Sequence, residues 1–133
     1  MFIKLIETES FNFDSVAASS SMILRRVRGV DVSRFSKYTL VVRLEDGTLG
    51  TNCTITFDAY PAWPLPADPS RDYETASTGG TVTLSSTSVI GRIQTATVTA
   101  QTGPALDLVI TGSKPAGGGN CNAIVSVGLL AYE

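Results

Sequence analysis

The sequence predicts an all-β fold, a two-sheet antiparallel β-sandwich with jelly-roll or Greek-key connections. Three observations predict it. Short segments rich in Thr, Val and Ile alternate between apolar and polar residues, clusters of turn-forming residues separate these segments at close intervals, and helical periodicity is nearly absent. The 133 residues are enough for one hydrophobic core, so we expect a single sandwich.

The N-terminal part of the chain alternates less regularly than the rest. Phe11 and Phe13 are separated by a polar residue, but a run of serines follows at 19–21. Two interpretations are open for this part: an edge strand of the sandwich, or an extended arm that becomes ordered on a partner. We therefore divide the chain into an N-terminal arm or edge strand at 1–20 and a β-sandwich domain at 21–133.

Six later segments alternate with a period of two residues, which places successive side chains on opposite faces of a sheet. On their apolar faces we expect Tyr38, Leu40, Val42 and Leu44; Cys53, Ile55, Phe57 and Ala59; Val82 and Leu84; Ala96, Val98 and Ala100; Leu106, Leu108 and Ile110; and Cys121, Ala123, Val125, Val127, Leu129 and Ala131. Each segment is predicted to be a half-buried strand whose other face meets solvent or a neighbour. We expect the last segment to be a central strand.

Turn-forming residues lie between these segments. They are Asp46 with Gly47, Gly50, the loop 61–72, Gly79 with Gly80, Gly103 with Pro104, and the glycine-rich stretch 112–120. Helical signals are confined to 16–21 and 31–36, and Asp31 or Ser33 could cap one helical turn in the second of these.

Composition and charge exclude several classes of partner. Of the residues, 43% are hydrophobic and 17% are charged, which is typical of a globular protein with few charges. The net charge of −2 gives no overall attraction to nucleic acid or to anionic lipid. No apolar run approaches the roughly 20 residues that span a bilayer, and we recognise no secretion signal. We therefore expect neither nucleic acid nor a membrane as partner.

The two cysteines, Cys53 and Cys121, both fall on the apolar face of a predicted strand. We expect both side chains to point into the core. Because a chain without a secretion signal is expected to stay in a reducing compartment, we predict buried, reduced thiols. A single disulfide is the alternative, since the sequence does not tell whether the two strands are neighbours.

The residues that most enzymes use for catalysis are missing or scattered. The chain contains no histidine, which removes the commonest general base and the commonest transition-metal ligand. Most of the 12 acidic residues lie in or beside predicted turns, as solvated carboxylates do in any β protein, which disfavours a catalytic carboxylate pair. We predict that the protein is not an enzyme.

Cofactor sites are equally weak in the sequence. Asp68, Asp72 and Glu74, or the surroundings of Asp46, offer oxygen ligands for calcium, but their spacing matches no calcium loop. The glycines at 117–119 precede a strand, whereas a phosphate-binding loop precedes a helix. We predict no metal and no cofactor.

Positive charge is concentrated in one part of the chain. Six of the ten cations lie between positions 25 and 43, namely Arg25, Arg26, Arg28, Arg34, Lys37 and Arg43. This pattern is typical of a solvated edge strand that charge protects against aggregation. It is also typical of a docking face for an acidic protein surface, and for that function we select Arg25, Arg26 and Arg28 as candidate interface residues.

The segment 60–73 is rich in proline and aromatic residues. It contains four of the six prolines and the only tryptophan of the chain. Prolines stiffen a loop before it binds, so Trp63, flanked by Tyr60 and Tyr73, is suited to anchor an interface or to stack on a sugar ring. The alternative is that Trp63 folds back and closes one end of the sandwich.

Residues 30–42 resemble a phrase found in small jelly-roll proteins of tailed bacteriophage particles, in which Asp31, an apolar residue, Ser33 and then the aromatic Phe35 precede the first strong strand. The end of the chain, with Leu129 to Ala131, is similar to their last strand. A similar phrase occurs in galactose-binding-like modules.

The resemblance implies a capsid decoration, or cement, protein of the virion. Such a protein is non-enzymatic, is often trimeric, and stabilises the phage head through contacts with the major capsid protein or other virion proteins. The alternative is a carbohydrate-binding module or the receptor-binding head of a fibre, in which Trp63 holds a sugar.

Overall fold

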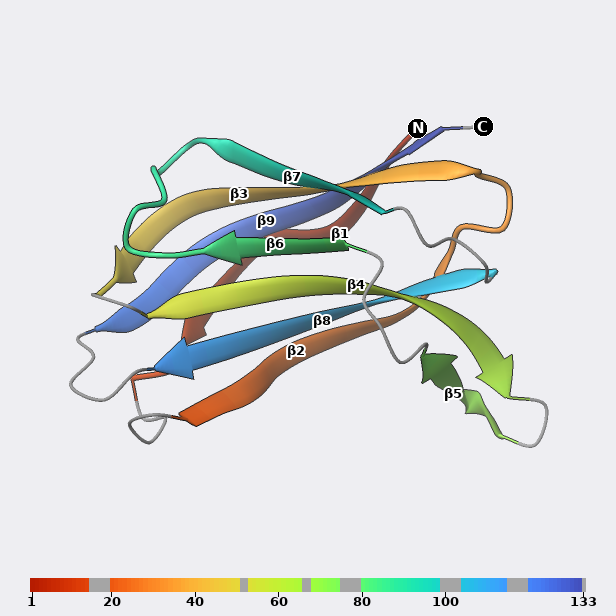
Figure 1. Ribbon diagram of the computed structural model, residues 1–133, viewed down its shortest axis with the longest axis horizontal. Helices are drawn as coiled ribbons and strands as arrows, with labels where there is room; N and C mark the ends of the chain where they lie inside the picture. The colour runs from red at the N-terminus through yellow and green to blue at the C-terminus, as the bar shows by residue number, and fades with distance from the viewer. Residues whose placement is uncertain are drawn as a thin grey trace.

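The computed structural model, shown in Figure 1, describes residues 1–14, 20–50, 53–65, 68–74, 80–98, 104–114 and 120–132; of 63–65 and 68–74 it describes the backbone alone. Every regular element in these ranges is a β-strand. The strands are β1 (Phe2–Asn12), β2 (Ser20–Asp31), β3 (Lys37–Leu49), β4 (Thr54–Leu65), β5 (Asp68–Glu74), β6 (Gly80–Leu84), β7 (Ile93–Val98), β8 (Ala105–Lys114) and β9 (Cys121–Tyr132). The predicted all-β class is confirmed.

The strands form two antiparallel sheets that face each other. The four-stranded sheet has the order β1-β9-β3-β7, and the five-stranded sheet has the order β2-β8-β4-β5, with β6 also paired to β4. The pairs β1·β9, β2·β8 and β3·β7 join strands that are far apart in the sequence, as in one long antiparallel hairpin rolled into a sandwich. This is the strand order of a jelly roll, which decides between the two predicted connections.

The predicted apolar faces form the core between the sheets. The described members of that set are buried, apart from Ala96, which packs half-buried against the same cluster, while Ala100 lies outside the described residues. The last strand, β9, lies between β1 and β3, as expected of a central strand. Alternation therefore identified the inward side chains correctly.

The N-terminal segment contributes to this core. β1 is an edge strand that pairs with β9 in a register interrupted near Lys4 and near Ile6. Phe11 and Phe13 are buried among core side chains, and Gly112 of β8 leaves room for the ring of Phe13. One core thus holds residues from both sides of the predicted boundary at position 20.

Two predicted turns are continuous strand. β3 runs through Asp46 and Gly47, because a register shift between Leu44 and Asp46 absorbs one residue and Gly47 adopts a φ of 120° opposite Ala123. β8 likewise continues past Gly112 to Lys114. A glycine inside a strand can mark such an irregularity or a close approach instead of a chain reversal.

The predicted loop 61–72 is largely a β-hairpin, so the loop prediction was wrong for most of its length. β4 extends to Leu65, and β5 returns along it with Trp63 opposite Tyr73. Proline tolerates extended backbone, and β4 no longer pairs with β8 beyond Ala62, so Pro64 interrupts no ladder with that strand. Figure 1 shows this hairpin projecting from one end of the sandwich.

Neither predicted helical turn is present in the described residues. Ser20 and Ser21 belong to β2, and 16–19 lie outside the described residues. At 31–36 the chain makes a tight turn, in which the Phe35 N–H donates to the Val32 carbonyl at 3.1 Å. Asp31 does cap, but it caps this turn: its carboxylate accepts from the N–H and the hydroxyl of Ser33.

The expectation of reduced thiols is wrong, because Cys53 and Cys121 form a disulfide with their Cα atoms 6.0 Å apart. Leu49, at the end of β3, is paired with Cys121, and the chain then turns at Gly50 so that the Cys53 N–H donates to the Gly50 carbonyl. Both side chains point inward, as predicted. The bond joins the two sheets at one end of the sandwich.

Within the described part of the chain, no helix is long and apolar enough to cross a membrane.

Candidate binding surfaces

The three candidate arginines lie on β2, the edge strand of the five-stranded sheet. Arg25 reaches across the open side of the sandwich, where its Nη1 lies 3.3 Å from Oε1 of Glu9 on β1. Arg26 is half-buried and paired with Val109 of β8, and Arg28 is exposed. Arg25 therefore closes the edge between the two sheets, and Arg28 presents its charge to solvent.

β8 separates the β2 arginines from β4, and its residue Asp107 has a neighbour on each side. Asp107 of β8 is 0% exposed, and its Oδ1 accepts a hydrogen bond of 2.9 Å from the N–H of Gly29, which follows Arg28. On the other side of β8, Tyr60 of β4 is paired with Asp107. Thus Tyr60 on β4 and Gly29 on β2, the residue that follows Arg28, lie on opposite sides of Asp107.

The other two aromatic candidates are placed by their backbone alone. Trp63 and Tyr73 are directly opposite each other in the β4–β5 register; Trp63 lies two strands away from β2, and Tyr73 lies three strands away. Whether Trp63 closes the end of the sandwich depends on a side chain outside the described set. The side chains of the candidate calcium ligands Asp68, Asp72 and Glu74 also lie outside the described set.

The six clustered cations do not form one face. Arg25, Arg26 and Arg28 belong to the five-stranded sheet, whereas Lys37 and Arg43 belong to β3 of the other sheet. Arg34 lies in the turn between β2 and β3, near the ring of Phe35. These cations are close in the sequence but are divided between the two sheets, because β2 and β3 belong to opposite sheets of the sandwich.

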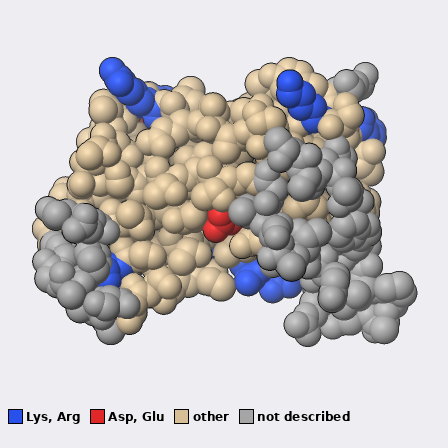
Figure 2. All heavy atoms as spheres, in the orientation of Figure 1, with Lys and Arg blue, Asp and Glu red and all other residues tan. Residues whose placement is uncertain are grey.

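The outer face of the five-stranded sheet carries few charges, as Figure 2 shows over β4, β6 and β8. Thr56 is paired with Thr83 on one side and with Thr111 on the other, so hydroxyls form a row across three strands. In the next row Thr81 donates a hydrogen bond of 2.6 Å to Asp58. This is a broad, polar surface with few charges, predicted in part by the threonine-rich phases of the strands.

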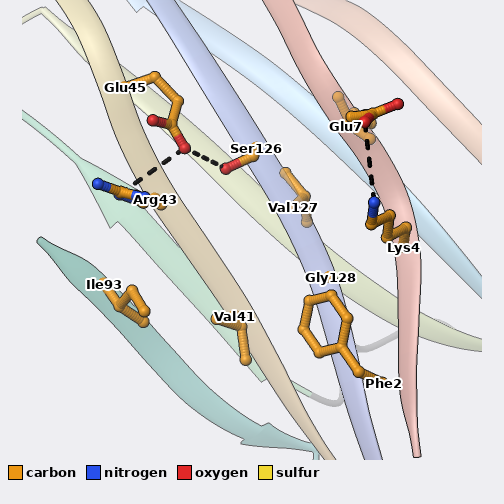
Figure 3. A pocket seen from close by; sticks show the side chains of 11 residues that line it. Phe2, Lys4, Glu7, Val41, Arg43, Glu45, Ile93, Ser126, Val127 and Gly128 are labelled. Atoms are coloured by element: carbon orange, nitrogen blue, oxygen red, sulfur yellow. Dashed lines mark hydrogen bonds and ion pairs between the residues drawn. The ribbon is translucent and has the colours of Figure 1, made fainter. Parts of the chain in front are cut away.

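The outer face of the four-stranded sheet is different, because it holds an apolar groove of about 300 Å³. Its floor is formed by Val41 of β3 and Gly128 of β9, with Phe2 on one side and Ile93 on the other. Phe2 is 54% exposed and Ile93 is 60% exposed. Figure 3 shows the Phe2 ring lying across β9 at Gly128 with its face toward the viewer.

Gly128 makes room for this ring. A Cβ at position 128 would lie 2.1 Å from Cζ of Phe2, far inside contact distance. The backbone partner of Phe2 in the register is Leu130, two residues further along β9, so the side chain leans along the strand to reach the glycine. The ring has backbone beneath it and solvent above it.

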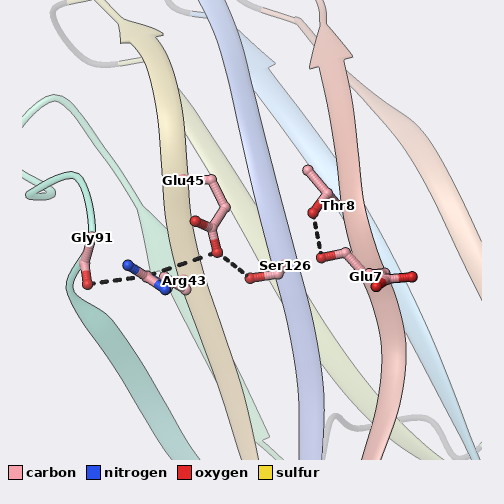
Figure 4. Close-up of polar contacts among 6 residues, drawn as sticks. All are labelled: Glu7, Thr8, Arg43, Glu45, Gly91 and Ser126. Carbon is pink, nitrogen blue, oxygen red and sulfur yellow. Dashed lines mark hydrogen bonds and ion pairs between the residues drawn. The ribbon is translucent and has the colours of Figure 1, made fainter.

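Polar groups line the groove beside this apolar floor. The Ser126 hydroxyl donates to Oε1 of Glu45 at 2.6 Å, and Nε of Arg43 lies 3.7 Å from the same oxygen. Nε of Arg43 also donates to the Gly91 carbonyl at 3.2 Å, so the guanidinium is held in place from the β7 side (Figure 4). On β1, Nζ of Lys4 lies 3.7 Å from Oε1 of Glu7.

The sequence did not predict this groove. Its residues come from β1, β3, β7 and β9, which only the jelly-roll order brings together. The one available signal was a set of apolar residues, Phe2, Val41 and Ile93, on the solvent-facing side of their strands.

The pKa is shifted from its ordinary value at two described side chains. Hydrogen bonds from Ser33 hold the pKa of Asp31 below its ordinary value, and burial raises the pKa of Tyr38. Both groups stabilise the turn between β2 and β3. Within the described ranges, no cluster of three or more His, Cys, Asp or Glu side chains is positioned to hold a metal ion.

No protein-family model, no curated protein and no solved structure matches the chain.

Proposed function

We propose that the protein is a non-enzymatic structural protein of a virus particle, a capsid decoration (cement) protein that stabilises a phage head through protein–protein contacts. The observation that carries this proposal is the jelly-roll strand order, β1-β9-β3-β7 facing β2-β8-β4 with β5 and β6. The jelly roll is an architecture of viral capsid and lectin domains. It supports a function of contact and binding.

The disulfide supports the same proposal. Bonds of this kind persist on the surfaces of virions and cells, where no reducing pool removes them. The Cys53–Cys121 bond joins the two sheets and adds rigidity to a shell-bound domain. We therefore propose the virion as the location of the mature protein.

The surface proposed to meet the major capsid protein is the part of the five-stranded sheet around Asp107, which carries Tyr60 on β4 and, next to Gly29, Arg28 on β2. The hairpin of β4 and β5 projects beside it (Figure 1) and carries Trp63 and Tyr73. Aromatic residues and arginine are the residues that most often dominate binding at interfaces. A homotrimer is the proposed assembly.

Addition to capsids tests the proposal directly. Purified protein is sedimented alone and with capsids of the virus that encodes it, and we expect self-association alone and co-sedimentation with capsids. Arg28→Ala and Tyr60→Ala should each weaken capsid binding by roughly tenfold or more. Arg92 is an exposed arginine just before β7, and Arg92→Ala is the matched control that should bind as the wild type does. A protein that neither self-associates nor binds capsids would contradict the proposal.

A second candidate function is a carbohydrate-binding module or the receptor-binding head of a fibre. The observation that favours it is the groove on the four-stranded sheet, where an exposed phenyl ring lies beside polar side chains. A glycan array distinguishes where such binding occurs. Loss of binding in Trp63→Ala would assign it to the β4–β5 hairpin, and retention would assign it elsewhere.

A further inference from the structure

The groove on the four-stranded sheet presents a platform on which a flat apolar surface can rest. The ring of Phe2 is supported from below by Gly128 and is open to solvent above. Val41 and Ile93 extend this apolar surface across β3 and β7. Exposed phenyl and branched aliphatic groups that are grouped on one face mark a binding site more often than single exposed apolar residues do.

The charges around the platform cancel. Lys4 and Arg43 are the two cations of the groove, and Glu7 and Glu45 are its two acids. Each cation lies 3.7 Å from an acid, so the groove has no net charge to attract an ionic ligand. The same pairs nevertheless place donors and acceptors side by side, which suits a neutral ligand rich in hydroxyl groups.

The donor and acceptor of one pair are fixed in position. Arg43 is held by the Gly91 carbonyl and by Glu45, and Glu45 is held in turn by Ser126. A guanidinium and a carboxylate that are held in this way can bond to two neighbouring hydroxyls of one ring without losing much side-chain entropy. Figure 4 shows Arg43, Glu45 and Ser126 aligned across β3 and β9.

We propose that this groove binds one neutral hexopyranose ring of a glycan. The C–H face of the sugar rests on Phe2 and Val41, and two adjacent hydroxyls bond to Arg43 and Glu45. A volume of about 300 Å³ is at the lower end of the range for small-molecule sites, which fits a single ring better than a long chain. The site is on the sheet opposite the surface proposed for the capsid, so a decoration protein can use both at once.

Two substitutions test the platform from opposite directions. Phe2→Ala removes the ring, whereas Gly128→Ala keeps it but adds a Cβ where Cζ of the ring now lies. The ring is the exposed end of a flexible side chain, so it can swing away and the fold is retained. Met22→Ala, which truncates an exposed apolar side chain on the other sheet, is the matched control.

The neutral probes are methyl β-D-glucopyranoside, methyl β-D-galactopyranoside, methyl α-D-mannopyranoside and N-acetylglucosamine, and the acidic probe is N-acetylneuraminic acid. Each is titrated while the NMR signals of the Val41 and Ile93 methyl groups are followed. We expect saturable shifts of these methyls with at least one neutral probe. Phe2→Ala and Gly128→Ala should each weaken that binding by roughly tenfold, whereas Met22→Ala and Trp63→Ala leave it unchanged.

Three outcomes overturn the inference: no neutral hexoside binds, N-acetylneuraminic acid binds while the neutral sugars do not, or binding depends on Trp63 and not on Phe2. Circular dichroism of each variant verifies the fold, and Gly128→Ala remains decisive if Phe2→Ala is unstable. Sugar binding with no capsid binding would leave the groove assignment standing and remove the decoration proposal alone.

Discussion

At the scale of single residues, Tyr38 shows how one hydroxyl can fix a turn. It is fully buried, and its hydroxyl lies 2.8 Å from the carbonyl of Val32 and 2.6 Å from that of Phe35. Replacement by phenylalanine leaves a buried carbonyl without its donor, and we expect a loss of about 1 to 3 kcal/mol of unfolding free energy. Urea denaturation of Tyr38→Phe measures it, with Tyr132→Phe on the surface as the control.

The same residue predicts an alkaline limit to stability. Burial raises the pKa of Tyr38 above its ordinary value of 10.0, so the folded state holds the phenolic proton more tightly than the unfolded state does. This contribution to stability is fully present below about pH 10 and is lost as the pH rises through the folded pKa. We expect the loss of stability as the pH rises above about 10 to be smaller in Tyr38→Phe than in the wild type. An identical loss in both proteins would contradict this assignment.

Gly47 is a second residue whose identity the backbone dictates. A Cβ there would lie 2.6 Å from the backbone of both Asn122 and Ala123, and its φ of 120° disfavours any other residue. Gly47→Ala should therefore lower the unfolding free energy by more than about 2 kcal/mol. Gly91→Ala is the matched control, because its φ is also positive but the nearest atom is the side chain of Arg43 at 3.7 Å. Equal losses in the two variants would show that the clash with β9 does not matter.

At the scale of strands, the jelly-roll order predicts a gradient of protection. β9 bonds to β1 and β3, whereas the short β7 bonds to β3 alone among the described strands. We expect the amides of β9 to exchange with deuterium more than about tenfold more slowly than those of β7, because an edge strand opens without unfolding the core. Exchange followed by NMR measures both strands in one sample, and similar rates would contradict the gradient.

The regularity of each strand's register determines how well the sequence predicts which side chains point inward. Period-two alternation predicted the inward side chains of β3, β4 and β9 because their registers are regular over the alternating stretches. β1 and β2 were harder to predict, since each contains two register shifts that break the alternation. The hairpin of β4 and β5 was interpreted as a loop because four prolines are more typical of turns than of strands.

A candidate site could be predicted only where its residues lie close together in the sequence. Tyr60 and Trp63 lie on β4 and Tyr73 lies on the adjacent β5, and the side chains of the last two are outside the described set. The burial of Asp107 was not predicted, because its strand phase is the solvent-facing one and its contact with Gly29 spans 78 residues. Likewise, no pattern along the chain indicates that Phe2, Val41 and Ile93 share a groove.

At the scale of the whole molecule, the two outer faces are proposed to have different functions. The five-stranded sheet is broad and nearly uncharged and ends in arginine and aromatic residues, which suits a protein interface. The four-stranded sheet is grooved and holds fixed polar pairs, which suits a small ligand. A bound partner on one face leaves the other exposed, so the two proposed activities do not compete.

The disulfide joins the two sheets, and its removal tests how much it stabilises the sandwich. It joins Cys53, just before β4, to Cys121 at the start of β9, with a sequence separation of 68 residues, and a loop of that length is expected to contribute about 4 kcal/mol by restricting the unfolded chain. Urea denaturation with and without dithiothreitol measures the difference, and the midpoint should fall on reduction.

The double variant Cys53→Ala with Cys121→Ala separates the bond from its surroundings. It should be destabilised about as much as the reduced wild type and should not respond to dithiothreitol. The single variant Cys53→Ala has lost the bond as well, so any difference between the single and the double variant reports only the packing of the buried Cys121 side chain. Two free thiols in the untreated, denatured wild type would contradict the bond itself. An unchanged midpoint on reduction would instead show that the core alone holds the two sheets together.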